Sequence, residues 1–179
     1  FHLGFHLARL KRHGEILGIN VPDIILPENL NGLVRITVST DGVDIRTIPF
    51  YQDIHIQAEG ITVGAPRWTR KLTGLKHGDW APYRQISKSV FAKGADVALL
   101  VHEFCIVDAD RAMPVILDHD GTVWISQAGM GGVDSITFEI CKPAILNAGF
   151  IINEGRLNER LVARAKEVVL LGTGMGAAR

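Results

Sequence analysis

One lysine stands in the glycine-bounded stretch TGLKHGDW (residues 73–80), where it could act as a nucleophile. A lysine amine forms a Schiff base with a carbonyl group when burial or nearby positive charge keeps part of it uncharged near neutral pH. Arg67, Arg70 and Lys71 precede Lys76 closely and could supply such a field. Most lysines in glycine-rich turns are solvated, so the spacing alone leaves a catalytic and a solvated Lys76 both open.

Two other segments could bind an anion. In EVVLLGTGMGAAR a hydrophobic run enters Gly172, Gly174 and Ala177, which formally fits the G-x-G-x-x-A dinucleotide fingerprint. A glycine turn whose N–H groups face a phosphate is a more economical interpretation, and a plain tight turn after a strand is an equally good one. In DSITFE (residues 134–139), Asp134 or Ser135 is expected to cap a helix whose first N–H groups are open to an anion.

Composition narrows the class of protein. The chain has 179 residues, of which 47% are hydrophobic and 21% charged, and its 19 basic residues balance 19 acidic ones. This balance does not favour nucleic-acid binding, and no run of about 18 apolar residues predicts a membrane span. Cys105 and Cys141 lack the spacing of a metal or redox motif, so we expect reduced thiols and no metal. We expect a cytoplasmic protein.

Hydrophobic periodicity predicts helices and strands in mixed order, and therefore a two-lobed α+β protein with mixed sheets. Residues 58–75, which are rich in glycine and proline, are interpreted as a linker at the domain boundary. Pro143 is expected to kink or break its helix. The predicted helices span residues 6–18, 83–92, 136–147 and 157–166; the predicted strands span residues 33–39, 43–49, 53–57, 96–102, 113–117, 122–126, 150–153 and 167–171.

The order of these segments resembles the class IV pyridoxal-phosphate-dependent aminotransferases. This fold-type IV family includes branched-chain and D-amino-acid aminotransferases and 4-amino-4-deoxychorismate lyase. The resemblance spans essentially the whole chain. It rests on FHLGFHLARLKRHGEILGI at the start, then on LTGLKHGDW, KGADVALLV, LDHDGTVWISQ, VDSITFE and AKEVVLLGTG.

The resemblance implies pyridoxal 5'-phosphate as cofactor and assigns roles by position. Lys76 would be the Schiff-base lysine, and Arg9 would bind the cofactor phosphate. Backbone N–H groups would complete the phosphate site at Ile136, Thr137, Gly172 and Thr173.

The resemblance also implies a domain organisation. It predicts a small N-terminal α/β domain at residues 1–65 and a larger C-terminal cofactor-binding domain with a mixed barrel-like sheet at residues 66–179. A homodimer is expected. Because the chain starts at Phe1 and stops after a glycine-rich turn, we expect a fragment without the first strands and last residues of the fold.

The chain departs from the family at the glutamate that faces the pyridine nitrogen. In IVDADRAMPVIL, counting back from Asp120-Gly121 puts Ala109 at that position, with Asp108 and Asp110 on either side. Asp110 is assigned the role here, and Asp108 is the alternative, although adjacent residues of a strand face opposite sides. An acidic edge or turn without cofactor contact is equally consistent. Pro114 replaces the family asparagine, while Ser135 and Phe138 replace a glycine and an arginine.

The resemblance and the departures from it lead to three functional hypotheses. The first is an aminotransferase that acts on a small amino acid and a 2-oxo acid through Lys76. The second is an aminodeoxychorismate-type lyase, which the G-L-K-H stretch favours. The third is a non-catalytic homologue, which the missing glutamate favours.

Overall fold

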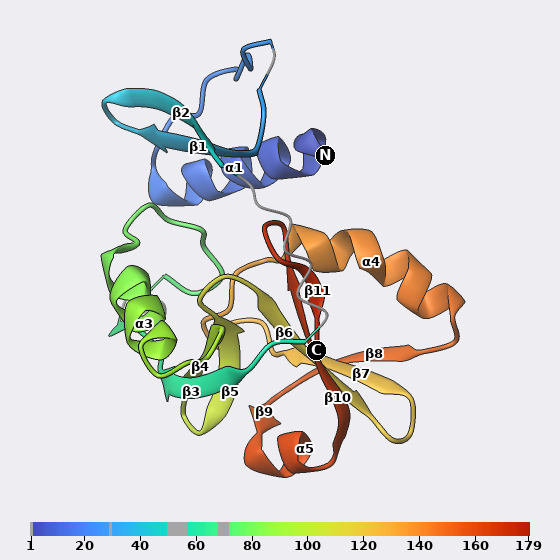
Figure 1. The fold of residues 1–179 in the computed structure, drawn as a ribbon. Coiled ribbons are helices and arrows are strands. Elements are labelled where there is room, and N and C mark those ends of the chain that lie inside the picture. The colour runs from blue at the N-terminus through green and yellow to red at the C-terminus, as the bar shows by residue number, and fades with distance from the viewer. Residues whose placement is uncertain (1, 29, 50–56, 68–71) are drawn as a thin grey trace. The chain divides into compact units, whose positions relative to one another are not determined.

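The computed structural model describes residues 2–28, 30–49, 57–67 and 72–179. The chain divides into two compact units. The first comprises Phe1–Gln52 with Lys76–Gly78, and the second comprises Asp53–Leu75 with Asp79–Arg179. The predicted boundary between residues 65 and 66 stays a prediction. Figure 1 shows the elements of both units.

The first unit contains one helix and one hairpin. Helix α1 (Leu3–Leu17) ends where Gly18 takes a left-handed conformation with φ 70°, as the sequence predicts. Strands β1 (Leu33–Ser39) and β2 (Gly42–Ile48) pair antiparallel, with Ser39 opposite Gly42 across a two-residue turn. The strand predicted at residues 53–57 lies almost wholly outside the described residues.

The second unit contains a four-stranded sheet in the order β3-β4-β5-β9. Its strands are β3 (Gly60–Gly64), β4 (Val97–His102), β5 (Cys105–Ala109) and β9 (Leu157–Asn158). β3 runs parallel to β4, and the other pairs are antiparallel. The linker interpretation of residues 58–75 is therefore wrong at β3, because Ile61 and Val63 pack against the core from alternate positions of a strand.

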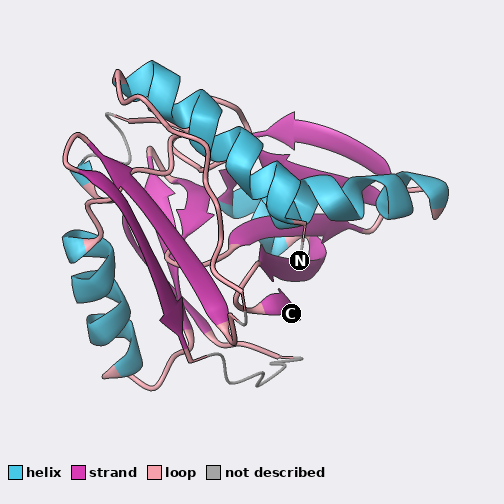
Figure 2. Cartoon of the chain, turned by 90° about the horizontal axis from the view of Figure 1, so that it is seen from above, coloured by secondary structure: helices cyan, strands magenta, loops and turns pink. Residues whose placement is uncertain are grey.

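A five-stranded sheet in the order β11-β10-β6-β7-β8 completes the second unit. Its strands are β6 (Met113–Asp118), β7 (Thr122–Ser126), β8 (Ile151–Gly155), β10 (Ala165–Gly172) and β11 (Gly176–Ala178). Helices α3 (Ala81–Phe91), α4 (Ile136–Asn147) and α5 (Glu159–Ala163) belong to the same unit. Figure 2 distinguishes the helices from the strands. The mixed α+β architecture is confirmed, as two separate sheets rather than one closed barrel among the described residues.

The helix predicted at residues 157–166 is wrong. These residues form the two-residue strand β9, the short helix α5 and the start of β10, because Asn158 caps a new helix by accepting the Leu161 N–H at 3.1 Å. Strands β5 and β11 were not predicted. Of the kink or break expected at Pro143, the break does not occur, since α4 continues through this residue; the kink stays a prediction.

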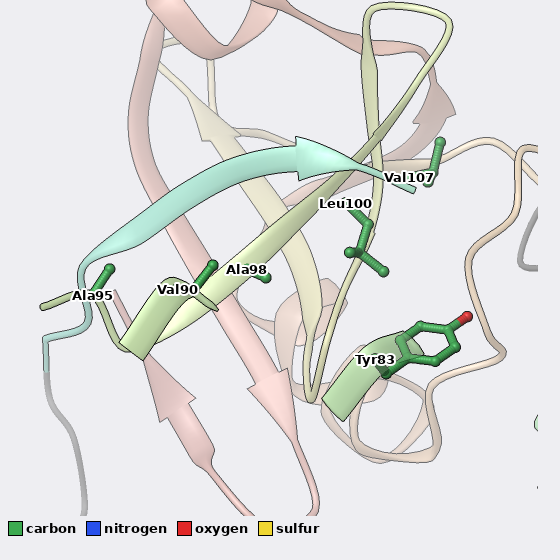
Figure 3. Packing of buried hydrophobic residues seen from close by; sticks show 6 residues of the cluster. All are labelled: Tyr83, Val90, Ala95, Ala98, Leu100 and Val107. Carbon is green, nitrogen blue, oxygen red and sulfur yellow. The ribbon is translucent and has the colours of Figure 1, made fainter. Parts of the chain in front are cut away.

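The core beside α3 joins this helix to the four-stranded sheet. Figure 3 shows Tyr83 and Val90 from α3, Ala98 and Leu100 from β4, and Val107 from β5. Ala98 and Leu100 are fully buried, at 0% exposure. These contacts hold β5, which contains Asp108 and is followed directly by Asp110. No helix in the described part of the chain is long and apolar enough to cross a membrane.

Candidate cofactor site

Lys76 lies in a loop of the first unit, and its backbone is held by a helix far away in the sequence. The Lys76 N–H donates to Nδ1 of His13 at 2.9 Å, and His13 is only 4% exposed. Two residues later, a Cβ added at Gly78 would come within 4.0 Å of Cγ2 of Thr37 on β1. The Lys76 side chain itself is exposed. The backbone of Lys76 is therefore held by α1, and Gly78 passes near β1.

Arg9 projects from the same face of α1 as two histidines. His6, Arg9 and His13 are spaced three and four residues apart, so they share one side of the helix. The pKa of His6 is lowered from its ordinary value of 6.5, first by burial, then by the positive charge of Arg9, with a smaller effect from Lys76. Arg9 and Lys76, both predicted site residues, thus lie within electrostatic reach of one ring and form a basic cluster.

The lowered pKa of His6 predicts that the free energy of unfolding depends on pH. A histidine whose folded-state pKa is depressed binds fewer protons in the folded than in the unfolded protein. The contribution of His6 to the free energy of unfolding is therefore complete above about pH 6.5 and is lost as the pH falls through that value. Urea denaturation between pH 7.5 and 5 is expected to show this decline and to show a smaller one in His6→Gln. An equal decline in both proteins would contradict the assignment to His6.

The start of α4 carries backbone donors that its own cap does not use. Ser135 is the N-cap, and its hydroxyl accepts the Phe138 N–H at 3.2 Å. Glu139 N–H makes the first helical bond, to the Ser135 carbonyl. Within the described residues, the N–H groups of Ile136 and Thr137 have no hydrogen-bond partner. Two donors at the positive end of the helix dipole are thus available to an anion.

Ser135→Ala is expected to destabilise the protein by about 1 kcal/mol, because it removes the side-chain acceptor at the N-cap. Chemical denaturation measures the change. Ser135→Asp is the matched control, since a carboxylate also caps a helix, and it is expected to retain the wild-type stability. An alanine variant as stable as the wild type would show that the cap contributes nothing.

The turn between β10 and β11 is the second segment that the sequence predicts to bind phosphate. Gly172 and Gly176 face each other at the ends of the two strands, and the Met175 N–H closes the turn on the Gly172 carbonyl at 3.2 Å. Thr173 is exposed at the tip. A Cβ at Gly172 would meet the Arg111 carbonyl oxygen at 2.7 Å, so only glycine lets the turn lie this close to the segment between β5 and β6.

The core of the second unit joins the start of α4 to the end of β10. Phe138 follows Thr137, and Leu171 precedes Gly172; both side chains are buried in one hydrophobic cluster with Val115 and Val123. Helix α4 also contacts β10 directly. The start of α4 and the end of β10, which carry the predicted residues 136, 137, 172 and 173, therefore pack on one core.

The two candidate carboxylates face different neighbours. Asp110 accepts hydrogen bonds from Ser87 Oγ of α3 and from the Ala98 N–H of β4, the latter at 3.2 Å. Asp108 binds the loop that leads into α4, because its Oδ2 accepts the Val133 N–H at 3.0 Å while Oδ1 accepts the Ala109 N–H at 2.8 Å. Asp108 thus lies toward the helix start that carries the free donors, and Asp110 lies toward α3.

Sequence reasoning missed three residues that shape the site. His13 and His6 read as ordinary helix positions, although their spacing with Arg9 was visible as one helical face. Gly132 gave no signal: a Cβ there would lie closer than 3.0 Å to the Val107 carbonyl oxygen, so this glycine lets the loop before α4 pack on β5.

The backbone of this chain superposes on solved enzymes over nearly its whole length. No protein-family model and no curated protein matches its sequence. Of the solved structures, a fold IV transaminase from Curtobacterium pusillum aligns with TM-score 0.79 and 17% identity, over 99% of this chain and 70% of that one. The chain has the fold of fold-type IV enzymes.

Two further solved structures align equally well. A protein proposed to be a 4-amino-4-deoxychorismate lyase, from Legionella pneumophila, has TM-score 0.81 and 16% identity, over 99% of this chain and 76% of that one. A hypothetical aminotransferase from Mycobacterium tuberculosis in its PLP-bound form has TM-score 0.81 and 14% identity, over 99% and 74%. The resemblance in the sequence motifs is thus confirmed at the level of the fold.

The donor set fits a phosphorylated aldehyde. In the second unit, free N–H groups at a helix start suit a phosphate. In the first unit, a guanidinium supplies a positive charge that does not titrate, and a lysine amine suits an aldehyde. Among the described residues no cluster of three or more His, Cys, Asp or Glu is placed to hold a metal ion.

Proposed function

We propose that this protein is a pyridoxal-phosphate-dependent aminotransferase that transfers an amino group between a small amino acid and a 2-oxo acid. The observation that carries the proposal is the arrangement on α1. One helix carries Arg9 and anchors the backbone of Lys76 through His13, and both cationic side chains act on the His6 ring. A phosphate ligand and an amine nucleophile held by one rigid element are what a cofactor with an anionic tail and an aldehyde requires.

Each residue has a separate task in binding. Arg9 would neutralise one phosphate charge, and the N–H groups of Ile136 and Thr137 would donate to the phosphate oxygens along the α4 dipole. Gly172 and Thr173 would add donors from the β10–β11 turn. Lys76 would bond to the cofactor aldehyde. Asp110, or Asp108 in its place, would face the pyridine nitrogen, and each can be tested as the asparagine variant.

In the reaction, bound pyridoxal phosphate supplies an electron sink for the charge that develops at the substrate α-carbon. Lys76 Nζ would take the proton from this carbon and return it to another position, as a general base and then a general acid. Arg9, on the helix that anchors the Lys76 backbone through His13, would hold the anionic end of the cofactor while this proton moves. We further propose that the active protein is a homodimer.

The test uses the protein mixed with pyridoxal 5'-phosphate. A visible absorption band is expected, and borohydride is expected to bleach it and to add the mass of the reduced cofactor to the peptide that contains Lys76. An amino donor and a 2-oxo acid acceptor should then exchange their amino group. A band with the mass added at a different lysine would overturn the role of Lys76, and the absence of any band would favour a non-catalytic homologue.

A lyase that releases pyruvate is the second candidate. The G-L-K-H stretch around Lys76 and the fold similarity to the protein from Legionella pneumophila favour it. The same lysine would move the proton, but no acceptor would be consumed. Pyruvate formed from 4-amino-4-deoxychorismate without an added 2-oxo acid would support the lyase, and amino transfer that requires a 2-oxo acid would support the aminotransferase.

A further inference from the structure

His13 is a buried polar side chain for which the proposed chemistry has no direct use. Its ring is 4% exposed, in the last turns of α1, and its Nδ1 accepts the Lys76 N–H across 63 residues of sequence. Lys76 lies in a loop, so no regular secondary structure supplies a partner for this N–H. A buried imidazole used as a backbone acceptor therefore ties the loop to the helix.

We propose that His13 is the positioning residue of Lys76, and that it holds the reactive amine at a fixed place relative to Arg9. This inference rests on the proposed role of Lys76. Arg9 and His13 are four residues apart on one face of α1, about 6 Å along its axis. A rigid helix between the phosphate ligand and the lysine anchor sets their separation before any ligand binds, which lowers the cost of ordering the site.

The geometry also fixes the state of the ring. Because Nδ1 accepts a hydrogen bond, it carries no proton, and a neutral ring must then carry its proton on Nε2. His13 is thus a neutral acceptor next to the Arg9 and Lys76 cations, rather than a third positive charge. An asparagine places an acceptor oxygen at the same distance from Cβ as Nδ1, whereas a leucine fills similar space without an acceptor.

The first test measures backbone amide exchange in the protein without cofactor, on peptides that cover residues 72–80. His13→Leu is expected to speed exchange at Lys76 about tenfold, the effect of losing one hydrogen bond, while His13→Asn stays within about threefold of the wild type. His119→Leu, the same substitution at an exposed turn, should change nothing. Because no cofactor is present, this result does not depend on the proposed enzyme activity.

The second test compares two ligands. His13→Leu is expected to weaken pyridoxal 5'-phosphate about tenfold and to leave inorganic phosphate within about twofold, since phosphate does not bond to Lys76. His13→Asn should restore the affinity for pyridoxal phosphate. A protein that fails to bind pyridoxal phosphate at all would overturn the proposed function, yet would leave the exchange result as evidence for the anchor.

Three outcomes would overturn the inference. Unchanged exchange at Lys76 in His13→Leu would show that the contact does not hold the loop. If His13→Leu speeds amide exchange throughout α1, the His13→Asn variant provides the decisive measurement. Fast exchange at Lys76 in a folded His13→Asn protein would exclude the role of residue 13 as a hydrogen-bond acceptor. Nitrogen NMR that finds the proton of His13 on Nδ1 would exclude the hydrogen bond itself.

Discussion

Lys76→Ala is expected to abolish the bound chromophore and to lower the amino-transfer rate by at least about 10³-fold. General acid–base catalysis by one positioned side chain accounts for about 10²–10⁴ of a rate enhancement, and this substitution also removes covalent attachment to the cofactor. The fold should tolerate the change, because the side chain is exposed and the bond to His13 is made by the backbone. Absorption spectra and initial rates at saturating cofactor measure the effect.

The matched control is Lys93→Ala, which removes an exposed lysine from the turn after α3. It should leave both the spectrum and the rate at wild-type values. Thermal denaturation of the two variants should agree within the error of the measurement. A Lys76→Ala protein that keeps the chromophore, or keeps more than about a tenth of the rate, is incompatible with Lys76 as the amine that performs the chemistry.

Elements with strong local signals were predictable from the sequence. Residues 136–147 form a helix with the predicted bounds, because Ser135 caps the start and aliphatic residues follow. Residues 33–39 form a strand with the predicted bounds, ahead of a two-residue turn. Gly18 ends α1 because a left-handed conformation suits glycine. In each case the residue that decides the structure lies within the element or next to it.

Elements decided by distant contacts were not predictable. Strand β5 contains Asp108, a residue that disfavours strands, and it exists because β4 and β9 pair with it on both sides and its five residues are all buried. Strand β3 has only five residues next to glycine and proline, and its pairing with β4 bridges more than 30 residues of sequence. Local propensity carries no information about such partners.

The same division applies to the site. The motif order selected Arg9, Lys76 and the segments near residues 136 and 172 as candidates, and the last two segments lie where α4 begins and β10 ends. The anchors that hold them were not visible. His13 acts on a residue 63 positions away, and Asp108 acts on one 25 positions away. An anchor is defined by its partner, and the sequence does not say which partner folding will supply.

Gly132→Ala is expected to be the most damaging substitution in the second unit that does not replace a proposed ligand residue. The added Cβ would lie closer than 3.0 Å to the Val107 carbonyl oxygen, and that atom belongs to β5, whose backbone is paired on both sides. The loop would have to move away, and the bond from the Val133 N–H to Asp108 would lengthen. We expect a loss of about 2–3 kcal/mol in the free energy of unfolding.

The displaced loop leads directly into α4, so its movement also shifts the free donors of Ile136 and Thr137. Phosphate affinity, measured by calorimetry on the folded variant, should fall at least about tenfold, because each lost charge-assisted hydrogen bond costs about 1.5–3 kcal/mol. Gly64→Ala on β3 is the control, since no atom lies within 4 Å of its added Cβ. If Gly132→Ala destabilises the protein but binds phosphate normally, the start of α4 is not the phosphate site.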